Sequence, residues 1–210
     1  MATISRELVQ RYRKSLDAIA DKPKPAIRAT LEKLGWEDIT LDANKAVAIM
    51  QAACQAGTDL AAVSSSNFYK RIRKLSLGGD TSALALSEYN PEATEGAVRY
   101  FVEAVVQGDN ALFVEKCLAR YDYEVRLAAR HCTQANARYD SAEVKWALVP
   151  EAGCCEYCQM IADLGFIDNW SGEVEIHEHC RCTTVPGFDG NTKIEGYSDG
   201  EYELYSDIAF

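Results

Sequence analysis

The sequence predicts a predominantly α-helical α+β fold, in which a multi-helix N-terminal region is followed by a small α+β module. Apolar residues recur at helical spacing through most of residues 1–140, whereas the run 144–149 is β-branched and aromatic, as in a strand. Five of the eight cysteines then fall within residues 154–182. We therefore divide the chain into a helical region to residue 140, a module over 141–188, and an acidic, tyrosine-containing arm over 189–210.

Length and composition exclude several classes of protein. The chain has 210 residues, of which 48% are hydrophobic and 26% charged, so a disordered or fibrous protein is excluded. No window approaches the run of roughly 18 apolar residues that a membrane helix requires, and residues 1–13 lack the apolar segment of a signal peptide. We expect no membrane association, and we expect folding in a cytoplasm, where cysteines stay reduced.

The first half of the chain is expected to be a series of helices joined by short breaks. Lys22-Pro23-Lys24-Pro25 ends the first helix, because a residue before proline avoids the helical region. Gly57 is expected to weaken or interrupt the third helix, and the serine-rich segment 64–67 to form a loop that caps the fourth. The predicted helices span 5–20, 25–34, 41–62 and 68–77.

After the break at Gly78-Gly79 the pattern predicts two stronger helices. One begins at Pro91, which suits a first helical position, and ends before Gly108-Asp109. The other spans 111–139, and a strand over 144–149 follows it. The long helix has an apolar stripe that includes Cys132 and Tyr139, and most of its arginines, Arg126 and Arg130 among them, lie off that stripe. Three cysteines are expected to pack in helical cores: Cys54, Cys117 and Cys132.

The formal net charge of −10 is unevenly distributed. Residues 1–148 carry 20 Lys and Arg against 19 Asp and Glu, whereas residues 149–210 carry 2 against 13. Binding to a phosphate backbone requires clustered Lys and Arg, so the C-terminal part is not expected to bind DNA by itself. The asymmetry favours a protein partner or a solvated tail.

Cysteine and histidine residues form two short knuckles. Cys155 and Cys158 make a C-x-x-C pair, and 18 residues separate it from the run His177-Glu178-His179-Cys180-Arg181-Cys182. Two such knuckles are typical of a structural zinc site, in which thiolates and imidazoles close a tetrahedron. The preferred ligands are Cys155, Cys158, His177 and Cys180, with Cys182 competing for the fourth place. Thiols without metal, buried as small apolar residues, and a local disulfide remain alternatives.

Known enzymatic motifs are incomplete in this region. His177-Glu178 opens an H-E-x-x-H pattern, but Arg181 stands where the second histidine would be. A zinc deaminase places H-x-E before P-C-x-x-C, which is the opposite order. We therefore expect no enzymatic activity, and the alternative is a zinc-supported enzyme that uses Glu173, Glu175 or Glu178 as acid or base.

One dense basic run lies on the helix predicted over 68–77. Lys70, Arg71, Arg73 and Lys74 could contact nucleic acid weakly and without sequence specificity, through phosphate groups. A solvated helix face is the favoured interpretation.

The knuckle region resembles the C-terminal signature of the phage Mu F-like head morphogenesis proteins, particularly the branch found in phages and prophages of actinobacteria. The resemblance covers residues 144–186 and departs from the usual pattern at Glu178 and His179 and in an extra Cys154, so that His179 or Cys154 could replace one of the ligands named above. The matching motifs are Cys155-x-x-Cys158, Leu164-Gly165-Phe166, His177-x-x-Cys180-Arg181-Cys182-Thr183 and Pro186.

The resemblance implies a minor head protein of a tailed phage. Such a protein is associated with the portal, acts in procapsid assembly and head morphogenesis, and resides in the head interior of the virion after assembly in the bacterial cytoplasm. Its implied partners are portal and capsid or scaffold proteins, with no small-molecule substrate. In that setting Arg181 is expected to support the knuckle or a contact. The enzyme alternative becomes a zinc-supported nuclease or a prophage toxin.

Overall fold

The computed structural model describes residues 2–151, 153–167, 180–188, 192–198 and 201–202. It confirms the predicted fold class, because helices dominate and a small group of strands follows them. Its helices are α1 (Arg6–Asp21), α2 (Lys24–Leu31), α3 (Ile39–Leu77), α4 (Pro91–Val106), α5 (Asn110–Tyr139) and α6 (Glu156–Asp163). Its strands are β1 (Ala2–Ile4), β2 (Val144–Val149), β3 (Thr183–Phe188), β4 (Thr192–Ile194), β5 (Tyr197–Ser198) and β6 (Glu201–Tyr202).

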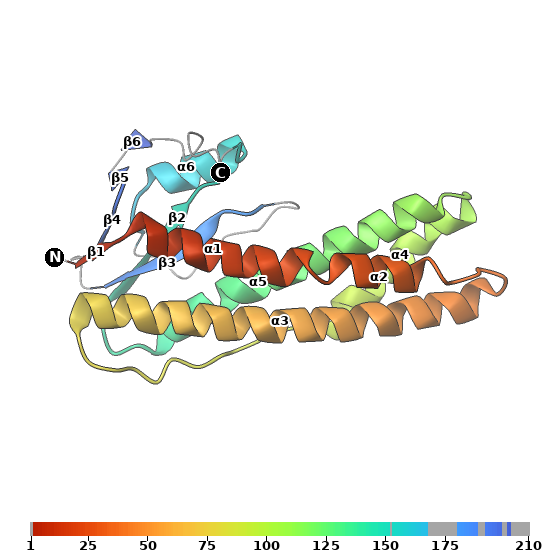
Figure 1. Ribbon diagram of the computed structural model, residues 1–210, viewed down its shortest axis with the longest axis horizontal. Helices are drawn as coiled ribbons and strands as arrows, with labels where there is room; N and C mark the ends of the chain where they lie inside the picture. The colour runs from red at the N-terminus through yellow and green to blue at the C-terminus, as the bar shows by residue number, and fades with distance from the viewer. Residues whose placement is uncertain (1, 152, 168–179, 189–191, 199–200, 203–210) are drawn as a thin grey trace.

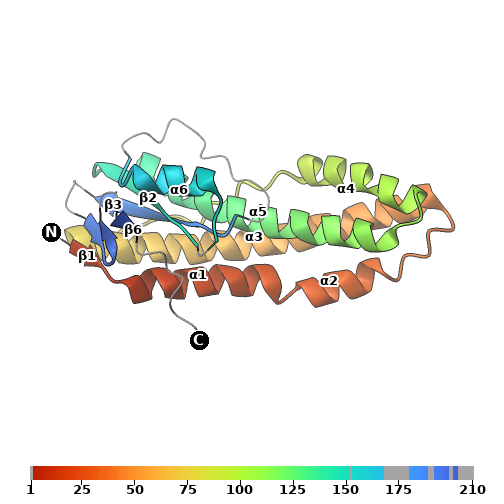
Figure 2. The same ribbon diagram turned by 90° about the horizontal axis from the view of Figure 1, so that it is seen from above.

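The molecule is elongated, and α3 and α5 run along most of its length (Figure 1). Helices α1 and α2 lie end to end beside α3, while α4 packs at the end farthest from the N-terminus (Figures 1 and 2). The strands and α6 gather at the other end. Helix starts are fixed by capping side chains, which satisfy amides that have no partner within the helix. The caps are Ser5 for α1, Asp38 for α3, Asn90 for α4 and Asp109 for α5.

Helix α3 is continuous over 39 residues, so the predicted interruption at Gly57 is wrong. Gly57 faces α5, where an added Cβ would lie 2.8 Å from the Tyr121 ring and from Val125 Cγ2. The glycine therefore serves close packing of two helices and does not end one. A helix of this length retains its hydrogen bonds around one glycine at a cost of about 1 kcal/mol.

The predicted loop at 64–67 is also helical. Its serines find tertiary partners: the hydroxyls of Tyr12 and Ser65 lie 2.6 Å apart, and Ser66 donates to the carbonyl of Ala83 at 3.0 Å. Local sequence favours a cap at such serines, but these longer-range hydrogen bonds satisfy the hydroxyls inside the bundle.

The main core lies between α3 and α5 and the helices around them. Cys54, Cys117 and Cys132 are fully buried in it, as predicted. Tyr139, expected on the apolar stripe, is 83% exposed because it ends α5 where the chain turns away towards β2. Arg126 and Arg130, expected off the stripe, are buried, and each has a specific partner described below.

Two small sheets close the end of the bundle that carries the N-terminus. Strand β2, at its predicted position, pairs antiparallel with β3, with Val149 opposite Thr183. Strand β1 pairs in parallel with β4, so that Ile4 lies opposite Ile194, and β5 and β6 extend that sheet. The boundary predicted at residue 140 follows the end of α5, but the pairing of β1 with β4 joins residues 2–4 and residues 192–194 in one sheet.

Helix α3 is also long and apolar enough to cross a membrane by the criteria of length and composition. Its most apolar window of 18 residues has a mean hydropathy of 1.2, and 44% of that window is buried inside the protein. Helix α3 therefore contradicts the expectation that no window approaches the length and apolarity of a membrane helix. A core helix of a soluble bundle meets the same criteria, and the burial of α3 against α5 gives no sign of a membrane protein.

We expect Gly57→Ala to lower the free energy of unfolding by about 1–3 kcal/mol, because the new methyl group meets Tyr121 and Val125 in a packed interface. The control is Gly96→Ala in α4, where an added Cβ meets nothing within 4 Å. That change should raise stability by up to about 1 kcal/mol through helix propensity. Denaturant unfolding of both variants checks this, and equal effects would contradict the close-packing role of Gly57.

Candidate metal centre

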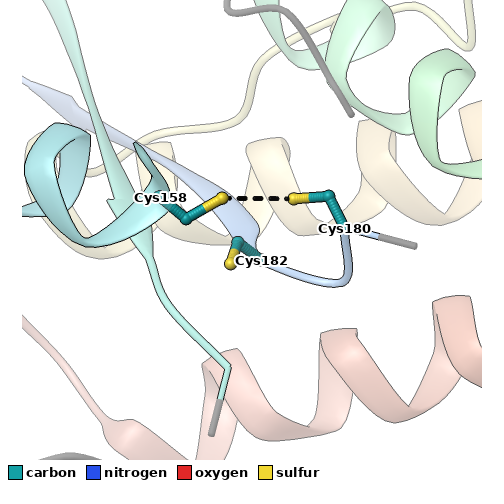
Figure 3. A group of neighbouring side chains, drawn as sticks. All are labelled: Cys158, Cys180 and Cys182. Atoms are coloured by element: carbon teal, nitrogen blue, oxygen red, sulfur yellow. Dashed lines mark hydrogen bonds between the residues drawn. The ribbon is translucent and has the colours of Figure 1, made fainter. Parts of the chain in front are cut away.

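Three thiols converge beside β2 and β3. Cys158 projects from α6, while Cys180 and Cys182 lie on the segment that enters β3 (Figure 3). Their Sγ atoms all lie within 4.8 Å of one another, and those of Cys158 and Cys180 are 3.5 Å apart. The three side chains are 2%, 4% and 7% exposed, respectively. This buried cluster could hold a metal ion.

A small apolar core of its own surrounds the cluster. Trp146 and Leu148 of β2 and Ala162 of α6 are buried with the three cysteines. Half-buried side chains from α5, Tyr123 and Leu127, pack against this core. Helix α6 is capped by Cys155, whose Sγ accepts from the Cys158 amide at 3.5 Å. The C-x-x-C spacing thus starts a helix whose first turn carries Cys158 into the core.

Arg130 of α5 provides the cationic partner of the cluster. Its Nη2 donates to Cys180 Sγ at 2.9 Å and to the Cys182 carbonyl at 3.2 Å. Within the described residues it pairs with no carboxylate, although it is only 5% exposed. A positive charge at this distance favours the ionised form of a thiol, so Arg130 is placed to stabilise a thiolate at Cys180.

The surroundings of the three thiols shift their pKa values in different directions. A hydrogen bond from Cys182, together with the charge of Arg130, lowers the pKa of Cys180 to about 4 despite burial. Burial and the neighbouring Cys180 raise the pKa of Cys158 to about 12. The hydrogen bond to Cys180, with burial, also raises the pKa of Cys182. Cys180 is therefore the thiol of the three whose surroundings most favour ionisation, and a bound cation would favour ionisation of the other two.

The structure brings together three of the five residues predicted as metal ligands: Cys158, Cys180 and Cys182. Cys155 is exposed, at the start of α6, and Cys154 beside it is half-buried. His177 and His179 lie outside the described residues. All eight cysteines are described, and none is paired in a disulfide.

Arg13 of α1 forms hydrogen bonds that connect the helices to β2 and β3. This residue was not identified from sequence. Its Nε donates to Thr183 Oγ1 at 3.1 Å, and its Nη2 donates to the carbonyls of Val149 and Pro150 at 3.1 Å each. One side chain thus contacts the end of β2 and the beginning of β3. No local pattern marks it, because its partners are at least 136 residues away in sequence.

Arg181, between the two cysteines of the C-R-C turn, contacts the helices. Its guanidinium lies 3.4 Å from Asp21 and 3.9 Å from both Asp17 and Asp122. Arg126 pairs with Asp17 and Asp122 at 2.9 Å each. This alternation of charges agrees with the supporting role expected for Arg181. The i,i+4 spacing of Asp122 and Arg126 is the one signal of the network that the sequence contains.

The four residues of the basic run point in different directions. Arg73 pairs with Asp140 at 2.8 Å, and the exposed Lys74 pairs with Asp80 at 2.8 Å. Lys70 is half-buried and Arg71 is exposed. The run is therefore not a single charged face, and its contact with nucleic acid stays a prediction.

Fold and site together define a class: a helical bundle that carries a small α+β part with a buried thiol cluster. The chain belongs to the VG15 protein family, whose family model matches residues 3–208. This membership indicates a phage protein. No curated protein and no solved structure gives a significant match to the chain.

Acidification should weaken the junction between the bundle and the C-R-C turn. Burial alone would raise the pKa of Asp122, but the charges and hydrogen bonds of Arg126 and Lys24 hold it below the ordinary value of 3.8. Because the folded pKa is the lower one, the stabilisation is complete above about pH 4 and is lost as pH falls through the folded pKa.

We expect Asp122→Asn to lower stability at neutral pH and to flatten the loss of stability below about pH 4. Unfolding curves between neutral pH and about pH 2.5 measure this. Asp80→Asn is the control, because Asp80 pairs with Lys74 in full exposure. If both variants behave alike, the buried network does not stabilise the fold.

Proposed function

We propose that the chain is a structural protein of the phage head, a portal-associated minor head protein that acts in procapsid assembly. Membership of a phage family and the resemblance of residues 144–186 to the Mu F-like signature support this proposal. The observation that carries it is the buried cluster of Cys158, Cys180 and Cys182. A buried metal site of this kind stabilises a fold, as a structural protein requires.

The metal ion that we propose for this cluster is a structural zinc ion. Sulfur ligands of a tetrahedral zinc site lie about 3.8 Å apart, given zinc–sulfur bonds of about 2.3 Å. The three Sγ atoms, all within 4.8 Å of one another, suit that geometry after small rotations. The fourth ligand comes from Cys155, one turn ahead of Cys158, or from His177.

Charge supports a set rich in thiolates. Three thiolates and one imidazole around Zn²⁺ carry a net charge of −1, which the single charge of Arg130 balances. Four thiolates would leave one negative charge unbalanced, whereas two thiolates and two imidazoles would leave Arg130 without an anion. The balance favours Cys158, Cys180, Cys182 and His177, and it leaves Cys155 as the cap of α6.

A metal bound here would stabilise the small α+β region after residue 140, whose apolar core is small. A segment of about 40 residues seldom builds a sufficient core of its own. Bound zinc would join α6 to the segment that enters β3, while Arg13, Arg130 and Arg181 connect that segment to α1 and α5. The bundle would then present the surface that partner proteins bind.

The alternative function, a nuclease or toxin supported by zinc, requires an open coordination position. The three sulfur atoms lie among Trp146, Leu148 and Ala162, which favours a closed site over a catalytic one. The carboxylates Glu173, Glu175 and Glu178, considered as acid or base, lie outside the described residues.

Elemental analysis of the purified protein should give one zinc per chain. X-ray absorption spectroscopy should place sulfur at about 2.3 Å from the metal. Cys158→Ser and Cys180→Ser should remove the metal and make the region after residue 140 sensitive to protease while the helices stay folded. Cys117→Ala, a buried cysteine outside the cluster, is the matched control and should retain the metal.

Arg130 provides a finer test of the same site. Arg130→Met should weaken zinc binding by about 10–100-fold in competition with a chelator, because a hydrogen bond to a ligand is lost. Arg130→Lys keeps the charge, so its zinc affinity should lie between that of Arg130→Met and that of the native protein. A folded native protein free of metal, or three protein ligands plus water, would contradict the structural zinc site.

The head assignment predicts that the protein is present in purified particles of the phage that encodes it, in few copies and in complex with the portal. Mass spectrometry of particles and of detergent-released portal complexes measures this. Deleting the gene should reduce the yield of properly assembled heads. Normal particles that lack the protein would contradict the assignment.

A further inference from the structure

We propose that the groove between α1 and α3 binds the phosphate backbone of nucleic acid, without sequence specificity. The groove lies where the beginning of α1 runs beside the end of α3, near the N-terminus (Figure 1). Its volume is about 260 Å³. Leu8, Arg11 and Tyr12 line it from α1, and Ser64, Asn67, Phe68 and Arg71 from α3.

Two arginines on opposite walls give the groove its charge. Arg11 and Arg71 are both exposed, and they come from helices 60 residues apart in sequence. Arg71 has no ion-pair or hydrogen-bond partner in the part of the chain that the structure describes. Arg11 has one acidic neighbour, Glu7, at 3.6 Å in an exposed pair, which solvent screens. Both guanidinium groups are therefore available to an anion.

Further basic residues extend the positive charge along both walls. Lys14 follows Arg11 by three residues on α1, and Lys74 follows Arg71 by three residues on α3, so each pair shares a helix face. Lys74 pairs with Asp80, an exposed contact that a phosphate could replace. Arg73, by contrast, is held by Asp140 and takes no part.

The rest of the groove suits the phosphate backbone of a nucleic acid and not its bases. The rings of Tyr12 and Phe68 stack on each other at 4.0 Å and are buried, so they offer no open face for a base. Asn67 can donate hydrogen bonds to phosphate oxygens, as such side chains commonly do, and so can Ser64 when Ser15 donates in the contact of 3.0 Å between their hydroxyls. Arginines together with small polar donors and no exposed aromatic ring define a contact that positions nucleic acid without reading its sequence.

None of the residues that line the groove belongs to the thiol cluster. An acidic protein segment would meet the same charges. Nucleic acid is favoured because the proposed place in the head would expose the groove to the packaged genome, a choice that rests on the proposed function, and because phosphates repeat along a strand as the basic residues do along the two walls.

The test is binding of a labelled DNA duplex of mixed sequence to the full-length protein, loaded with metal, by fluorescence anisotropy across a salt series. Arg11→Gln combined with Arg71→Gln should weaken binding and reduce the slope of log K against log salt by about 2, because two phosphate contacts are lost. Duplexes of different sequence should bind equally.

The matched control is Lys22→Gln with Lys33→Gln, which removes two exposed charges outside the groove. It should leave the slope unchanged. Absence of DNA binding at low salt, an equal loss in the control, or tighter competition by polyglutamate than by DNA would overturn the proposal. None of these outcomes would alter the metal content or the presence of the protein in particles, which test the proposed head function separately.

Discussion

The packing of α3 on α5 is the constraint on which the rest of the molecule depends. Two helices of 39 and 30 residues approach closely because Gly57 has no side chain where Tyr121 and Val125 pack. The three fully buried cysteines of the bundle belong to this pair of helices. The pair also provides the platform for the small α+β part, since α5 carries Arg130, which contacts the C-R-C turn, and Asp122, which lies beside Arg181 of that turn.

The junction between the two parts is made by arginines and not by apolar surface alone. Arg13 and Arg130 reach from helices to the strand region, and Arg181 reaches from the strand region to the helices. Each of the three has more than one partner. Such contacts are specific in direction, because a guanidinium binds only where acceptors match its planar geometry. Charges that would be costly in isolation are paired here with carboxylates at Arg181 and with the sulfur of Cys180 at Arg130. Thiol chemistry and the attachment of the small part are therefore coupled through one side chain.

Sequence reasoning succeeded where the pattern is long and local. The periodicity of α5, the proline at the start of α4 and the β-branched run of β2 each determine their element within a few residues. It failed at Gly57 and at the serines of 64–66, because their role depends on partners in α1, α5 and the segment after α3. The cysteines of the cluster were identifiable from spacing, but Arg130 was not, since its partners lie about 50 residues away and nothing local distinguishes it from other arginines of α5. Strands of two or three residues, such as β1 and β4, carry too few positions for a recognisable alternation.

The pairing of β1 with β4 sets an order on folding. Ala2 lies opposite Thr192, so the two strands of this pair come from opposite sides of all six helices in the sequence of the described residues. The packing of α3 on α5 needs only residues 39–139, whereas this sheet also needs residues 192–194 and closes a much longer loop. Until the sheet forms, β1 has an unpaired edge. The strand end of the molecule is consequently completed after the helical bundle has formed.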